Sequence, residues 1–150
     1  LSIHVSLIRM SYALLAFIML NGILALCLRK KESENNVSGN DAIQDNRIEQ
    51  LTLVSRLLLY PATFFLGAGI FLGAVWANVS WGRYWAWDPK EVWALITFLV
   101  YGVAFHSQSL RIFRKPLFLH IYMILAFLTV LMTYFGVNYV LGGMHSYANA

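Results

Sequence analysis

Long apolar runs alternate with shorter polar stretches along this chain, and the runs are long enough to cross a membrane. A helix needs about 20 mainly apolar residues to span a bilayer. Four stretches reach or approach that length, so we predict an all-α integral membrane protein, a bundle of about four transmembrane helices. The predicted spans are residues 4–28, 51–75, 91–107 and 117–141.

The polar stretch between the first two runs, residues 29–50, contains Asn, Ser and Gly and shows no apolar face. It is predicted to be a solvated cytoplasmic loop, because short loops rich in Lys and Arg stay on the cytoplasmic side. The N-terminal end, the connection between the second and third runs and the C-terminal end are then predicted to face outward. The basic residues behind this orientation are Arg29, Lys30, Lys31, Arg47, Arg111, Arg114 and Lys115.

Composition supports a membrane protein: 59% of residues are hydrophobic and 12% are charged, and the mean hydropathy is +0.63. The net charge of +4 comes mainly from the basic clusters, so no nucleic-acid partner is expected. Cys27 is the single cysteine, which excludes a disulfide within the chain, and no CxxCH motif for covalent haem is present. Because the chain begins at Leu1, we interpret residues 1–150 as one transmembrane domain of a longer polypeptide.

The most unusual stretch is WGRYWAWDPKEVW, residues 81–93, which together with Trp76 holds all five tryptophans. Tryptophans also form belts at membrane interfaces, but a belt would spread them over the ends of every helix. Their concentration in one outward-facing segment favours a platform for a large, flat, apolar ligand, with the belt as the alternative. Asp88 and Glu91 are expected to cap the next helix, since Asp-Pro-x-Glu before an apolar run is a helix start.

The four histidines fall at different depths of the predicted bundle. His4 and His145 lie at the outward ends of the first and last spans, on the side of the tryptophans. His106 lies about 22 Å below Glu91 at 1.5 Å per residue, and an ionisable residue inside a span is a functional candidate. For His120, near the inner start of the last span, a hydrogen-bonded structural role is favoured.

Two outward histidines and an aromatic platform fit haem better than other ligands. Two imidazoles can ligate haem iron from opposite faces, and cations such as Arg9, Arg83 and Lys90 can pair with its propionates. Zinc is less favoured because it needs three or four ligands close together, and the pattern gives no support for nucleophilic catalysis by Ser or Cys. These patterns leave three classes open: a haem-handling protein, a b-type cytochrome for electron transfer, and a structural membrane protein without haem.

The segment GAVWANVSWGRYWAWDPKEVWALITF, residues 73–98, resembles the tryptophan-rich "WWD" segment of the cytochrome c assembly family. The flanks HVSLIRMSYALLAF at 4–17 and TYFGVNYVLGGMHSYA at 133–148 are similar to the two outward histidine segments of that family. The DPKEVWAL ending and the pair Tyr84 and Trp85 resemble the system II branch, called CcsA or ResC, or the C-terminal part of the fused CcsBA form.

This resemblance implies a protein of cytochrome c biogenesis that exports haem b and attaches it to the CxxCH cysteines of apocytochrome c. It implies a haem lyase or synthase within a larger complex, with a CcsB- or ResB-like subunit, apocytochrome c and thiol-reducing proteins as partners. His4 and His145 would ligate the iron at an outer site, and His106 at an inner site with a histidine outside this chain. The implied location is the bacterial inner membrane, with the tryptophans periplasmic, or alternatively the thylakoid membrane. The other residues expected at the haem are Trp76, Trp81, Arg83, Tyr84, Trp85, Trp87, Asp88 and Trp93.

Overall fold

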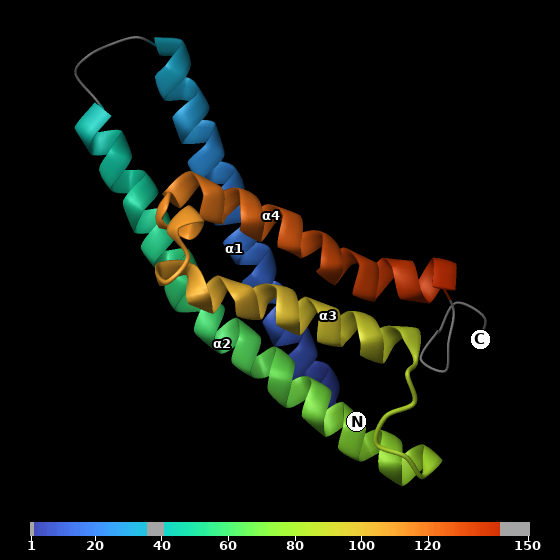
Figure 1. Cartoon of the computed structure of the whole chain (residues 1–150). Helices are drawn as coiled ribbons and strands as arrows, with labels where there is room; N and C mark the ends of the chain where they lie inside the picture. The colour runs from blue at the N-terminus through green and yellow to red at the C-terminus, as the bar shows by residue number, and fades with distance from the viewer. Residues whose placement is uncertain (1, 36–40, 142–150) are drawn as a thin grey trace.

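The computed structural model describes residues 2–35 and 41–141, and these residues form helices joined by short connections (Figure 1). The predicted all-α fold is therefore confirmed for the described part of the chain. Two 3₁₀ turns, η1 and η2, join the third helix to the fourth, and the fourth continues as a π-helix, η3. The elements are α1 Ser2–Asn35, α2 Asp41–Trp81, α3 Pro89–Val103, η1 Ala104–Gln108, η2 Arg111–Arg114, α4 Pro116–Leu131 and η3 Met132–Leu141.

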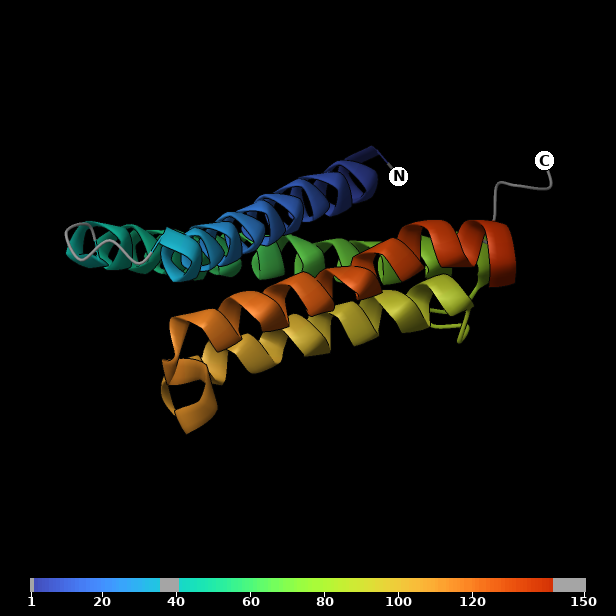
Figure 2. The same ribbon diagram turned by 90° about the horizontal axis from the view of Figure 1, so that it is seen from above.

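The helices form two antiparallel pairs, α1 with α2 and α3 with α4, which pack across one another (Figures 1 and 2). α1 makes its most extensive contacts with α2 and also packs on α4, while α3 lies against α2, α4 and η3. The start of α1, the end of α2, the start of α3 and the end of η3 lie at the same end of the bundle (Figure 1). We call this end, which carries residues 76–93, the tryptophan end.

Two glycines allow α1 and α2 to approach each other closely near the tryptophan end. A Cβ atom on Gly69 would lie 2.5 Å from Cδ1 of Ile8, and one on Gly73 would lie 2.7 Å from Cε1 of His4. The spacing of four residues places both glycines on one face of α2, as in small-xxx-small contacts between membrane helices. Further along, the Ser11 hydroxyl donates to the carbonyl of Ala62 at 2.8 Å. These contacts set the position of α1 along α2.

Three helical stretches among the described residues are long and apolar enough to cross a membrane: Ser2–Lys31, Asp45–Trp81 and Pro116–Tyr139. The third predicted span, residues 91–107, is instead divided between α3 and η1. α3 has 15 residues, or about 22 Å at 1.5 Å per residue, which is less than the roughly 30 Å of a hydrocarbon core. The five residues of η1 add about 10 Å, because a 3₁₀ helix rises about 2 Å per residue. α3 therefore reaches about the thickness of the core only together with η1.

The prediction of a loop over residues 29–50 was wrong in its secondary structure. α1 continues to Asn35 and α2 begins at Asp41, so helix covers most of that stretch. Lys, Glu, Ala and Gln have good helix propensity, and a helix that continues a packed one does not need a new nucleus. Absence of an apolar face therefore did not mean absence of a helix. A guanidinium nitrogen of Arg29 lies 3.6 Å from a carboxylate oxygen of Asp45, which links the two extensions.

His120 is fully buried on α4 and binds α2 through Thr52, in agreement with the structural role favoured from the sequence. Its Nε2 lies 2.9 Å from the Thr52 hydroxyl, which itself donates to the carbonyl of Ile48 at 2.8 Å. A hydroxyl has one proton, so both bonds form together only when Nε2 of His120 is protonated and donates. His120 thus fastens α4 to α2 within the helix core.

Candidate functional site

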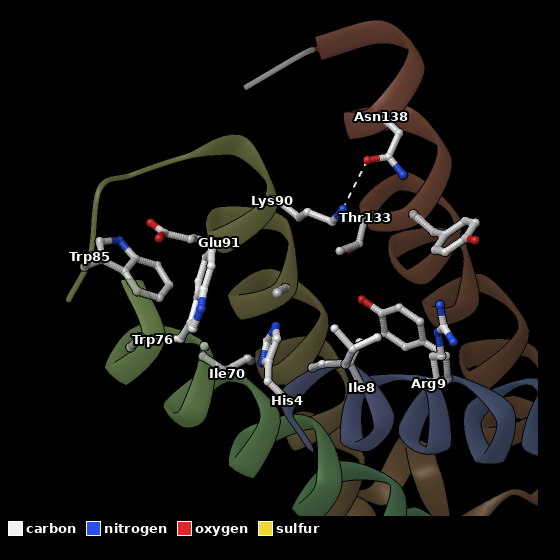
Figure 3. A pocket seen from close by; sticks show the side chains of 16 residues that line it. His4, Ile8, Arg9, Ile70, Trp76, Trp85, Lys90, Glu91, Thr133 and Asn138 are labelled. Carbon is white, nitrogen blue, oxygen red and sulfur yellow. Dashed lines mark hydrogen bonds between the residues drawn. The ribbon is translucent and has the colours of Figure 1, made fainter. Parts of the chain in front are cut away.

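A cavity of about 390 Å³ lies at the tryptophan end, between α1, α2, the start of α3 and η3 (Figure 3). Its volume is within the range of small-molecule sites, about 300–1,000 Å³. The cavity brings together residues from both ends of the sequence. Of the residues singled out above, His4, Arg9, Trp76, Trp85, Lys90 and Glu91 line it.

His4 lies against the backbone of α2 at the wall of this cavity. Its Nδ1 is 2.6 Å from the carbonyl oxygen of Gly69, and a carbonyl only accepts, so Nδ1 carries the proton and donates. In the neutral ring, Nε2 then carries the lone pair, which is the form of histidine that ligates metals. The missing side chain at Gly73 leaves the space in which the imidazole lies. Nε2 of His4 is therefore the ring nitrogen that could ligate a metal ion.

Four of the five tryptophans form two edge-to-face pairs. Trp76 and Trp81 have ring centroids 5.0 Å apart, and those of Trp85 and Trp87 are 6.1 Å apart. One member of each pair, Trp76 and Trp85, lines the cavity, and Figure 3 shows both on the same side of it. Trp87 is 75% exposed. Of the tryptophans predicted to form a platform, two therefore lie at the cavity, and each contacts a second ring.

The connection between α2 and α3 begins and ends with local signals in the sequence. α2 ends at Trp81, where Gly82 adopts a left-handed conformation with φ 72°, and the Gly82 N–H donates to the carbonyl of Asn78 at 2.9 Å. Glycine is favoured there because it has no Cβ penalty. α3 begins at Pro89 after the N-cap Asp88, whose carboxylate accepts from the Lys90 N–H at 3.1 Å. The predicted cap is confirmed.

Glu91 holds the last part of this connection in place. Its Oε2 accepts from the backbone N–H of Ala86 at 2.9 Å and from that of Asp88 at 3.3 Å. The residue between them, Trp87, has φ 57°, a left-handed conformation that costs a bulky residue about 1–3 kcal/mol. The Glu91 carboxylate thus binds the amides on both sides of the strained residue and positions Trp85 beside the cavity.

We therefore expect Glu91→Ala to loosen the connection at residues 82–88. Both amides lose their acceptor, at a cost of about 0.5–2 kcal/mol, the range measured for helix caps. Limited trypsin digestion should show faster cleavage after the exposed Arg83. Glu91→Gln is the matched control, because its amide oxygen still accepts, and it should digest like the unaltered protein. Equal acceleration in both variants would mean that the negative charge, not the pair of hydrogen bonds, holds the connection.

Two of the three predicted cations lie at the cavity. Lys90 donates from Nζ to Oδ1 of Asn138 on η3 at 3.1 Å. Partial burial lowers the pKa of Lys90 below its usual value, and the nearby Asp88 carboxylate partly offsets that effect. Arg9 of α1 lines the same cavity. Arg83 is exposed on the connection and is not among the lining residues.

Several predicted site residues lie elsewhere. Asp88 is 5% exposed and acts as the helix cap, while Tyr84 is exposed on the connection and Trp93 is half-buried on α3. His106 is exposed on η1, which follows the end of α3 opposite the cavity. Neither these residues nor Trp81 and Trp87 line the cavity. His145 lies outside the described residues.

The cavity also contains polar residues that the sequence analysis did not select. Tyr12 lies two turns beyond His4 on α1, and Thr133 and Asn138 come from η3. The spacing of eight residues between His4 and Tyr12 was the available signal, since it places them on one helix face. No comparable signal existed for Thr133 and Asn138, because the π-helical winding of η3 departs from the 3.6-residue period.

Comparisons with known proteins identify the family of this chain. The chain matches the family model described as "Cytochrome C assembly protein" over residues 1–145. It is 40% identical to Protein NrfI of Wolinella succinogenes over 148 residues, 99% of this chain and 16% of that protein. It is 40% identical to the cytochrome c biogenesis protein CcsA of Chlamydomonas reinhardtii over 149 residues, 98% of this chain and 40% of the relative. The corresponding protein of Guillardia theta is 35% identical over 163 residues, 98% and 53% of the two chains. The chain thus spans about half the length of these relatives or less.

Proposed function

Because the chain belongs to the cytochrome c assembly protein family, we propose that it binds haem in the cavity at the tryptophan end and presents it for attachment to apocytochrome c. A role in cytochrome c biogenesis and helices suited to a membrane are the premises of this proposal. The observation that carries it is the orientation of His4. Its Nδ1 donates to Gly69, so Nε2 holds the lone pair in a cavity lined by Trp76 and Trp85.

The donor set suits haem b, a flat apolar ring with an iron centre and an acidic edge. His4 offers an imidazole for the iron, the two tryptophans offer ring surfaces, and Arg9 and Lys90 offer positive charge. The second axial ligand in this proposal is His145, which follows η3 in the sequence. Bis-histidine ligation would hold the iron from both faces.

The reaction we propose is addition of the two CxxCH thiols to the two haem vinyl groups. Each sulfur bonds to the vinyl carbon next to the ring, and the thiol proton passes to the terminal carbon, so no electrons are gained or lost. The chain would contribute by holding haem in position, since the reacting groups belong to haem and the peptide. The CxxCH histidine would then replace one of the two histidines and release the product.

The chain covers only part of its relatives, and the complete activity is proposed for a larger assembly. We propose a haem lyase or synthase complex with a CcsB- or ResB-like subunit, and with thiol-reducing proteins that keep the cysteines reduced. The tryptophan end would face the bacterial periplasm, or the lumen if the protein resides in a thylakoid. His106 would receive haem at the inner side together with a histidine from outside this chain.

The test is transfer of haem to a reporter cytochrome by the full-length protein and its partner subunit in a strain lacking its own assembly proteins. We expect covalent haem on the reporter, visible after denaturing electrophoresis. A reporter with Cys→Ser changes in CxxCH is the matched control and should carry none. Stable haem in the membrane protein without transfer to the reporter would instead favour a b-type cytochrome for electron transfer.

A further inference from the structure

The cavity has two chemically different sides, with His4 between them. Figure 3 shows Trp76, Trp85 and the Glu91 carboxylate on one side of His4 and Arg9 on the other side. In this view the end of the Lys90 side chain lies between His4 and Arg9. One side is therefore aromatic and bordered by a negative charge, while the other is cationic. A ligand that is itself apolar at one edge and acidic at the other would bind such a cavity in one orientation.

Arg9 is an unusual residue for its position in the chain. Within residues 1–28 it is the sole Asp, Glu, Lys or Arg, and it lies in the apolar stretch Ser2–Lys31. A charge inside a membrane helix is costly and marks a functional site. It follows His4 by five residues, about 7.5 Å along α1, in the direction away from the tryptophan end. Arg9 lines the cavity, and a role there would explain why a charged residue is kept within this apolar helix.

Lys90 brings a second cation to the cavity from a different helix. Its ammonium group has three N–H donors, and it donates a hydrogen bond to Oδ1 of Asn138. Glu91 is the one carboxylate residue among the described residues that line the cavity, and it is engaged by the amides of Ala86 and Asp88. A ligand carboxylate would therefore be attracted to Arg9 and Lys90 and repelled from the side of Glu91.

We propose that Arg9 and Lys90 bind the two haem propionates, which orients the apolar half of haem, with its vinyl groups, toward Trp76 and Trp85. This inference rests on the proposed function, namely that haem occupies this cavity. Arg is well suited to the role because its planar guanidinium binds a carboxylate through two parallel hydrogen bonds. The vinyl edge then faces the connection at residues 82–88, and apocytochrome c reaches haem from that side.

The experiment compares haem with haem dimethyl ester, in which both propionates are neutral. The full-length protein with its partner subunit, freed of haem in detergent, is titrated with each compound and followed by absorbance. We expect Arg9→Gln and Lys90→Gln each to weaken haem binding about tenfold or more, as for loss of a charge-assisted hydrogen bond. Binding of the ester should be the same in both variants as in the unaltered protein. Arg114→Gln, on exposed η2, removes the same charge away from the cavity and should change neither.

Three results would overturn the orientation. Equal losses for haem and ester would show that Arg9 and Lys90 shape the cavity without binding propionates. Selective loss of haem binding in Arg83→Gln, but not in Arg9→Gln, would place the propionates at the connection and reverse the orientation. Equal affinity of the unaltered protein for both compounds would exclude a propionate site. If neither compound binds, the proposed function itself fails, which is a separate outcome.

Discussion

His4→Ala is expected to remove most of the haem that copurifies with the full-length protein. The Gly69 carbonyl holds the imidazole in the tautomer with its lone pair on Nε2, so under the proposed function the substitution would remove an axial ligand and leave the aromatic wall in place. The haem content should decrease at least about tenfold. Removing even a hydrogen-bond partner of a metal ligand lowers metal affinity about 10–100-fold, and a ligand itself should matter at least as much. Absorption spectra of the unaltered and variant proteins, normalised to protein, measure it.

Added imidazole provides the control for this variant. His4→Ala leaves a space beside the Gly73 backbone, and free imidazole can occupy it and ligate the iron. Haem content should therefore recover when imidazole is present during purification, and size-exclusion profiles should match those of the unaltered protein. If His4→Ala keeps its haem without imidazole, the iron is held elsewhere, and an internal electron-transfer haem becomes the better interpretation.

Gly73→Ala is expected to reduce haem binding with little effect on the fold. The added Cβ would lie 2.7 Å from Cε1 and 3.0 Å from Nδ1 of His4, so the ring must move and its bond to the Gly69 carbonyl is lost. The atoms displaced belong to a side chain, so the helices can stay where they are. We expect a loss of about tenfold or more in haem content, comparable to loss of a hydrogen-bond partner of a metal ligand.

Gly102→Ala is the matched control for Gly73→Ala. A Cβ on Gly102 of α3 meets no heavy atom within 4 Å, and Ala is favoured over Gly in a helix by about 0.5–1 kcal/mol. This variant should keep its haem and unfold at an equal or slightly higher temperature in detergent. Similar haem loss in both glycine variants would contradict the specific contact between Gly73 and His4.

Local signals explain why several features could be predicted from the sequence. The start of α3 was recognisable because Asp88 and Glu91 act within one turn of that helix. The aromatic clustering was recognisable because the tryptophans are adjacent in the chain. By contrast, the helical character of residues 29–35 and 41–50 was missed, since polar helices that extend a membrane span have no periodic apolar face. The short α3 was missed because hydropathy alone does not distinguish an α-helix from a 3₁₀ turn.

Long-range packing decided which candidates meet. Nothing in the sequence distinguished Arg9 and Lys90 from Arg83 as cavity residues, or Trp76 and Trp85 from the other tryptophans. Those distinctions depend on how α1 lies along α2, which Gly69 and Gly73 set through contacts with Ile8 and His4 more than 60 positions away. The hydrogen bond between His4 and Gly69 spans 65 positions, and no local pattern encodes it.

By itself, the sequence determined that this chain forms membrane-spanning helices with an aromatic segment between two of them, and that it resembles the family to which it belongs. These properties follow from apolar length, helix capping and residue order, which act over neighbouring residues. Only the tertiary structure decided that His4, two tryptophans and two cations share one cavity, and that its aromatic and cationic sides differ. The side on which a helix presents each residue depends on where its neighbours pack, and that packing is a property of the whole bundle.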